Sequence, residues 1–189
     1  MTPPTQAAVH EWALAYLTNR PASVAEMRRV LARRIDGWAR RARKAEVDAE
    51  AIEAGAHTAR ERAEAVIERL QASGLLDDVT YAKHRAERLA REGKSRRAVS
   101  FDLAKRGIAS ELARASIDQD PATELAAAAS LLRKKRIGAF SRKATAEIDA
   151  RERQRWLGAL ARAGYSFSTA ERALRLDREA AEELLRSLR

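Results

Sequence analysis

The sequence has no cysteine, few aromatic residues and little glycine or proline, and what it lacks excludes several classes of protein. Without cysteine the chain can form neither a disulfide framework nor a thiolate metal site. Runs of β-branched residues typical of strands are also absent. No apolar run approaches the roughly 20 residues that cross a bilayer. The N-terminal stretch MTPPTQAAVHEWALAYL lacks the basic and apolar regions of a secretory signal. We therefore expect a cytoplasmic protein.

The residues that the chain does contain favour helices and carry a strong positive charge. Of 189 residues, 46% are hydrophobic, many of them alanine, and 34% are charged, which predicts an all-α fold. The net charge is +10, with 30 arginines against 7 lysines. A compositional bias toward arginine explains that ratio but not the surplus of positive charge. An excess of this kind attracts polyanions, nucleic acid above all, although arginine suits acidic protein surfaces equally well.

One short motif, Gly93-Lys94-Ser95, matches the end of a phosphate-binding loop. The complete motif needs a first glycine five residues before the second, with a strand before the loop and a helix after it. That position holds Arg88, and the preceding residues show helical spacing. The motif therefore does not predict an ATP site, and an ATPase would require detectable hydrolysis by the pure protein.

The same residues belong to an internal repeat. Two sets of leucines recur at intervals of 72 and 71 residues: Leu17, Leu89 and Leu160, and Leu31, Leu103 and Leu174. In each copy a helix is expected to end in a tight turn, and a serine precedes the next helix. Gly93 is then a left-handed residue that ends one helix, and Ser95 is the N-cap of the next.

The other two copies predict capping boxes, in which the glutamate also binds the N–H of the cap residue. These are Ser23 with Glu26 and Ser168 with Glu171. Asp120-Pro121 predicts a cap followed by the first residue of a helix that runs to about Arg136.

The segment from Asp36 to Ala59 does not fit the repeat. Its first part is basic, its second part is acidic, and Trp38 is its one large aromatic residue. We predict an extended or broken helix here, with a partly mobile insertion as the alternative, and we expect Trp38 to pack rather than to lie exposed.

Few residues suggest catalysis or metal binding. His10, His57 and His84 lie far apart and have no partner at ligand spacing, so they are expected to be surface residues. Asp77-Asp78 could bind a divalent metal ion, but adjacent acids at a helix start are more simply explained as a cap. We expect no catalytic residues, no metal site and no cofactor.

The basic residues are clustered, and the segment from Ala45 to Thr80 holds nine acidic residues against three arginines. Any one cluster could be an ordinary solvated helix face. Because three clusters recur near the same turns, we predict one continuous binding surface for a protein or nucleic-acid partner. Its residues are Arg28, Arg29, Arg33, Arg34, Arg40, Arg41, Arg85, Arg88, Arg91, Lys94, Arg96, Arg97, Lys105, Arg106, Arg133, Lys134, Lys135 and Arg136.

These repeats carry a family resemblance. Three groups of residues match: Ala13, Leu14, Tyr16, Leu17, Arg20, Ser23, Glu26, Met27 and Leu31; Gly74-Leu75-Leu76-Asp77-Asp78, Tyr81-Ala82, Gly93, Leu103, Lys105, Arg106, Gly107 and Ile108; and Lys134-Lys135, Gly164-Tyr165-Ser166, Ala173 and Leu174. On the basis of these residues, most of the chain resembles the RecX family, whose members regulate the bacterial recombinase RecA. The segment from Asp36 to Ala59 is longer than the usual link in that family.

The resemblance implies three tandem three-helix repeats, over residues 1–76 (with the charged insertion at about 36–59), 77–119 and 120–189, in an elongated, curved molecule. It also implies a non-enzymatic monomer that binds RecA or its nucleoprotein filament. There it would modulate, mainly by inhibition, the recombination, ATPase and SOS-related activities. Single- or double-stranded DNA is a further expected partner, and a membrane is not.

The alternative function is a free-standing basic protein that reads DNA through a helix-turn-helix. The helix after Ser95 would carry Arg96 and Arg97 into the major groove. The repeats offer no dimerisation element to set the spacing of half-sites, which weighs against this alternative.

Overall fold

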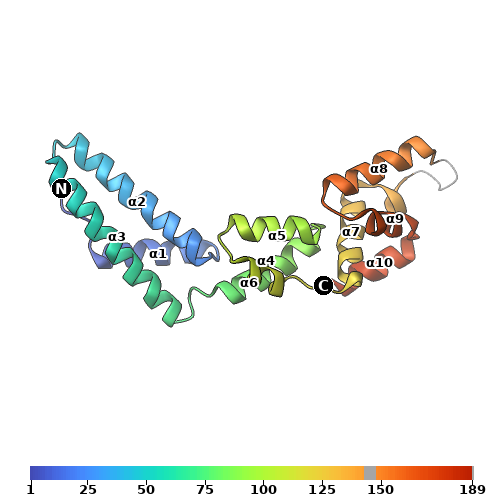
Figure 1. Ribbon diagram of the computed structural model, residues 1–189, viewed down its shortest axis with the longest axis horizontal. Helices are drawn as coiled ribbons and strands as arrows, with labels where there is room; N and C mark the ends of the chain where they lie inside the picture. Colours follow the sequence, from blue (N-terminus) through green and yellow to red (C-terminus); the bar gives the residue numbers. More distant parts are fainter. Residues whose placement is uncertain (143–147, 189) are drawn as a thin grey trace. The chain divides into compact units, whose positions relative to one another are not determined.

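The computed structural model describes residues 1–142 and 148–188, and every regular element within those ranges is a helix (Figure 1). The all-α prediction is confirmed. The elements are α1 (Gln6–Asn19), α2 (Val24–Lys44), α3 (Ala49–Ala72), α4 (Asp78–Arg91), α5 (Arg96–Lys105), α6 (Ser110–Ser116), α7 (Pro121–Lys135), the 3₁₀ turn η1 (Gly138–Phe140), α8 (Ala150–Arg162), α9 (Phe167–Arg175) and α10 (Arg178–Ser187).

The chain forms two compact units. The first contains residues 1–81 together with 106–108, and the second contains residues 82–105 together with those from 109 onward. The three-repeat division and the elongated, curved shape stay predictions. None of the described helices is long and apolar enough to cross a membrane.

The core of the first unit lies between α1, α2 and α3. α2 contributes Met27, Leu31 and Ile35, which recur at helical spacing, and α3 contributes Val66 and Leu70. The segment from Asp36 to Ala59 is a continuation of both long helices, because α2 runs on to Lys44 and α3 begins at Ala49. A short turn at residues 45–48 separates them. The predicted broken helix is confirmed.

Trp38 is only 5% exposed, so its predicted packing is confirmed as well. Its indole N–H donates to the carbonyl of Thr2 at 2.9 Å. α3 passes the ring at Gly55, where an added Cβ would lie 2.7 Å from the Trp38 ring and 2.8 Å from Pro3. Glycine is required at this position by the close approach of the two side chains.

The second unit is built around α7, which is buried along most of its length and packs against α9 and α10. Its main core includes Leu125, Leu132, Leu160 and Tyr165. The predicted cap is confirmed, because the Asp120 side chain accepts from the N–H of Ala122 and Pro121 is the first helical residue.

The prediction that Gly93 ends one helix and Ser95 caps the start of the next is confirmed. Gly93 has a φ of 79° and ends α4. A Cβ there would also lie 2.8 Å from the backbone nitrogen of Leu131. Ser95 Oγ accepts from the N–H of Ala98 at 3.2 Å, so it caps α5.

The capping boxes are only partly correct. Ser23 Oγ does accept from the N–H of Glu26 at 3.1 Å, but the Glu26 carboxylate binds Tyr16 and Arg106 instead of turning back to the cap. The Ser168–Glu171 box is wrong. Ser166 caps α9 and accepts from the N–H of Thr169 at 3.1 Å.

Glu171 is not part of a cap at all. Its carboxylate binds Arg153 at 3.0 Å and Arg175 at 2.9 Å, so it joins α8 to α9. Three hydroxyl side chains stand within four residues at the start of α9, and the sequence does not distinguish which of them becomes the cap.

Candidate polyanion-binding surface

α2 carries a basic stripe on the face opposite its core. Successive helical residues turn by about 100°, which places Arg29, Arg33, Arg40 and Lys44 on one side, opposite the buried Leu31. All four are exposed, and none forms an ion pair with any residue in the described ranges. We call these four residues the α2 stripe. Cations that lack protein partners remain available to a polyanion.

Residues beside the α2 stripe are engaged within the first unit. Arg28 forms a two-pronged pair with Glu64 of α3, with both distances at 2.7 Å. The Arg34 guanidinium lies over the Trp12 ring, 5.6 Å from its centre. Asp36, the one acid on this face, lies 3.4 Å from Arg60. The α2 stripe is therefore bordered by residues that hold the helices together.

Glu26 is the centre of a half-buried polar cluster in the first unit. Its carboxylate accepts from Tyr16 at 3.0 Å and from Arg106 at 2.8 and 2.9 Å. Burial alone would raise the pKa of Glu26. The hydrogen bonds from Arg106 and Tyr16 outweigh it, so that its pKa lies below the ordinary value. Ser23 Oγ also donates to the carbonyl of Arg106 at 2.6 Å.

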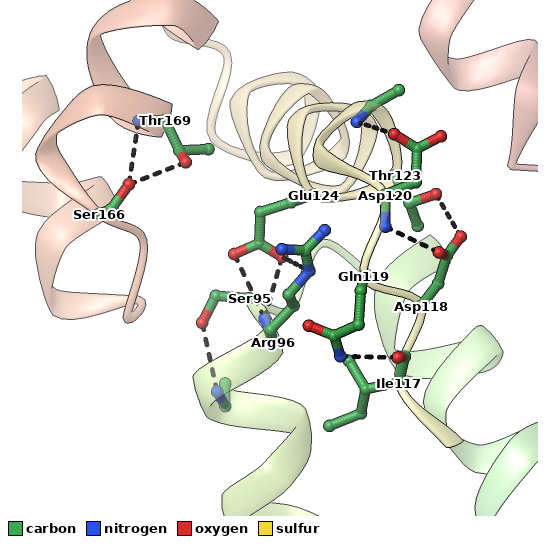
Figure 2. Close-up of polar contacts among 12 residues, drawn as sticks. Ser95, Arg96, Ile117, Asp118, Gln119, Asp120, Thr123, Glu124, Ser166 and Thr169 are labelled. Carbon is green, nitrogen blue, oxygen red and sulfur yellow. Dashed lines mark hydrogen bonds and ion pairs between the residues drawn. The ribbon is translucent and has the colours of Figure 1, made fainter. Parts of the chain in front are cut away.

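A related cluster in the second unit surrounds the start of α5 (Figure 2). Glu124 of α7 accepts from the backbone N–H of Arg96 at 3.0 Å, and it lies 3.8 Å from Arg96 Nε. Burial raises the pKa of Glu124 above its ordinary value, although the Arg96 N–H and charge oppose the shift. Ser95 Oγ donates to the carbonyl of Ala163 at 2.7 Å, which ties α5 to the end of α8.

Tyr165 lies close to this cluster and is buried. Its hydroxyl has no hydrogen-bond partner among the described residues. Burial, with the nearby charge of Glu124, holds the pKa of Tyr165 well above its usual range. The hydroxyl therefore stays protonated and does not act as a base.

An open pocket of about 490 Å³ lies beside the start of α5. Its walls come from α5, α6 and the segment between α6 and α7, which is held by its own hydrogen bonds. One of these runs from the Gln119 amide to the Ile117 carbonyl at 2.8 Å (Figure 2). The lining residues are Arg96, Arg97, Ser100, Ser110, Glu111, Arg114, Ile117 and Gln119. Because Arg96 is already paired with Glu124, the positive excess comes from Arg97 and Arg114 against Glu111, and the pocket favours an anionic group.

The basic residues at the end of α7 approach the end of α4. Lys134 Nζ donates to the carbonyl of Glu92 at 2.6 Å, and Ser130 Oγ donates to that of Arg91 at 2.7 Å. Cations at the end of a helix also interact favourably with its dipole. Two of the three predicted basic clusters thus come together within the second unit.

A comparison with protein-family models gives no match, but individual proteins are clearly similar. The chain is 32% identical to the regulatory protein RecX of Myxococcus xanthus over 164 residues, which cover 86% of this chain and 81% of that protein. The chain belongs to the RecX family. It is also 41% identical to the regulatory protein RecX of Mycobacterium leprae, over 56% of this chain and 61% of that protein. The corresponding protein of Thermobifida fusca is 39% identical, over 62% of each chain.

In this RecX-family chain, some residues of the predicted binding surface are engaged within the protein, and others are exposed without an ion pair to a described residue. Five form ion pairs within the protein: Arg28, Arg85, Arg88, Arg96 and Arg106. Lys134 binds a carbonyl and Arg34 stacks on an aromatic ring. The others are exposed and form no ion pair with a described residue: Arg29, Arg33, Arg40, Arg41, Arg91, Lys94, Arg97, Lys105, Arg133, Lys135 and Arg136. Their role as one continuous binding surface stays a prediction.

Sequence reasoning missed Arg114 of the pocket in the second unit. Arg114 is the only basic residue between Arg106 and Arg133, so a search for basic clusters passes over it. The only local signal is its place in the stretch from Ser110 to Ile117, whose apolar residues Leu112 and Ile117 favour a short helix.

The adjacent acids Asp77 and Asp78 each accept a hydrogen bond from a backbone N–H at the start of a helix, as the predicted cap requires. Asp77 accepts from the N–H of Val79, and Asp78 accepts from the N–H of Val24, both at 2.9 Å. No group of three metal-binding side chains occurs among the described residues.

Proposed function

We propose that this chain is a non-enzymatic regulator that binds the recombinase RecA and limits its activity. Membership of a family of proteins named as regulators supports a regulatory role, and the proposal adds RecA as the target. The observation that carries it is the α2 stripe, because its four cations face solvent with no protein partner among the described residues. A RecA filament assembled on DNA offers phosphates for such a surface.

The mechanism we propose is competition by occupancy. The chain lies along the filament, contacts successive protomers and nearby phosphates, and obstructs strand exchange and filament growth. Inhibition of the ATPase and SOS-related activities follows from fewer intact filaments. Several weak contacts that act together give an affinity that no single arginine supplies. Removing one of the predicted repeats, such as residues 120–189, is therefore expected to weaken binding far more than any one arginine substitution.

A pull-down with purified RecA tests the proposal. The full chain is immobilised and presented with RecA alone, with RecA and single-stranded DNA, and with both plus a non-hydrolysable nucleotide analogue. We expect the strongest retention in the third mixture, where filaments form. Absence of retention in all three mixtures would reject RecA as the partner.

The helix-turn-helix alternative gains little support from the start of α5. Arg96, which would read bases, is held beside Glu124, and its guanidinium is only partly exposed. A specific reader prefers its own duplex by about 10³-fold or more over random sequence. Gel shifts with a panel of duplexes are expected to show no such preference, and a preference of that size would favour the alternative.

A further inference from the structure

The middle of α5 presents an aromatic side chain to solvent. Phe101 is 74% exposed, the largest exposed fraction among the large apolar residues in the described ranges. Two nearby residues of the same helix, Val99 and Leu103, are buried instead. Phe101 is therefore not needed for the core, and its exposure has no structural explanation within the unit.

Cations flank Phe101 on both sides. Arg97 is four residues before it and Lys105 four residues after it, so both share its helix face. Both are exposed, and neither forms an ion pair with a described residue. The nearest acid along the helix, Asp102, is bound by Arg85 at 2.8 and 2.9 Å. The aromatic ring thus stands in a locally positive surface.

The same surface continues into the pocket described above. Arg97 and Ser100, which lies next to Phe101 in the chain, line that pocket together with Arg114. An anionic group bound in the pocket is thereby placed within a few residues of an exposed ring. An aromatic face beside phosphate-binding cations is the arrangement that holds single-stranded nucleic acid.

We propose that α5 and α6 form a binding site for single-stranded nucleic acid, in which one base stacks on Phe101 while Arg97, Lys105 and Arg114 contact adjacent phosphates. Single strands are favoured because their bases have a free face, whereas the bases of a duplex are already stacked and paired. An acidic protein surface fits less well, because it would leave the exposed ring without an apolar partner. The site deepens the proposed function, since a recombinase filament contains such a strand.

The test measures binding of a fluorescently labelled oligothymidine by anisotropy at low salt. Phe101→Ala is expected to weaken binding roughly five- to 150-fold, the range seen for loss of one base–aromatic contact. Phe101→Trp should retain affinity, and its fluorescence should be quenched by the oligonucleotide. Phe167→Ala is the matched control, because Phe167 is 70% exposed but has Glu171 rather than a cation four residues on. It should leave affinity unchanged.

Three results would overturn the proposal. Phe101→Ala could weaken oligothymidine binding no more than Phe167→Ala does, or it could leave that binding unchanged. It could also weaken binding to a duplex of the same length as much as binding to the single strand. A further arm uses RecA without DNA. If Phe101→Ala weakens RecA binding but not oligonucleotide binding, the ring contacts protein and the proposed site is wrong. Because RecA retention by the unmodified chain is measured separately, failure of the proposed function is distinguishable from failure of this site.

Discussion

At the scale of single residues, two serines each do more than cap a helix: they also hold together segments far apart in the sequence. Ser23 and Ser95 are buried, and each accepts a hydrogen bond from its own helix while donating to a carbonyl distant in the sequence. The carbonyls belong to Arg106 and Ala163, each followed by a glycine of positive φ. One hydroxyl therefore joins local capping to tertiary packing.

Replacement of Ser95 by alanine should consequently cost more than the loss of an ordinary cap. We expect Ser95→Ala to lower the free energy of unfolding by about 1–3 kcal/mol, because the Ala163 carbonyl loses its buried donor as well. Urea denaturation followed by circular dichroism measures the change. Ser168→Ala, at the exposed serine that does not cap α9, should change stability by under about 0.5 kcal/mol. Equal effects of the two would contradict the double role.

Two glutamates should give opposite dependences of stability on pH. The folded pKa of Glu26 lies below the ordinary value of 4.5. Its contribution to stability is therefore present above pH 4.5 and is lost as the pH falls through the folded pKa. Glu124 has a raised folded pKa, so its contribution is present below pH 4.5 and is lost as the pH rises through the folded pKa.

Thermal unfolding measured from pH 3 to pH 7 tests both signs. Glu26→Gln is expected to reduce the loss of stability on acidification, because the carboxylate that Arg106 and Tyr16 stabilise is gone. Glu124→Gln is expected to reduce the loss that accompanies rising pH near and above pH 4.5. Parallel shifts of the whole curve by both variants, with no change in shape, would contradict the assigned pKa directions.

At the scale of helices, Gly55 reverses a general rule. Alanine normally stabilises the interior of a helix relative to glycine by about 1 kcal/mol. Within α3 an added methyl group at Gly55 would meet Trp38 and Pro3 at under 3 Å, so we expect Gly55→Ala to destabilise the first unit. Gly37→Ala in α2 is the matched control, because its nearest neighbour would be the flexible Arg41 side chain at 3.6 Å.

Differential scanning calorimetry should show the melting temperature falling for Gly55→Ala and rising slightly for Gly37→Ala. A rise for both variants would mean that Pro3 and Trp38 move aside at little cost. The contact would then not explain why glycine is found at position 55.

Helix positions were predictable because they depend on short-range features of the sequence. Leu31 and Leu103, which recur in the repeat, are both buried, and Asp120-Pro121 located the start of α7. The pairing of arginines was not predictable, because it depends on residues far apart in the chain. Arg106 meets Glu26 across 80 positions and Arg28 meets Glu64 across 36. The sequence therefore identifies basic clusters but not which of their members are free.

At the scale of the whole molecule, the net charge of +10 attracts polyanions at long range whether or not any arginine touches them. Direct contact differs from this general attraction in its dependence on salt. Each phosphate neutralised by the protein releases bound counterions, so affinity falls with salt by a slope of about 0.7–0.9 per contact on a logarithmic scale. The slope therefore distinguishes contact from net charge when two variants lose equal charge.

The triple variant Arg29→Gln, Arg33→Gln and Arg40→Gln removes three charges from the α2 stripe. We expect its salt dependence of DNA binding to flatten by about two to three in slope, because three phosphate contacts are lost. The control triple, Arg69→Gln, Arg151→Gln and Arg155→Gln, removes the same charge from exposed positions outside the predicted surface. Its slope should remain close to that of the unmodified chain. Anisotropy titrations at several salt concentrations measure both, and equal flattening by the two triples would mean that net charge, rather than the α2 stripe, governs binding.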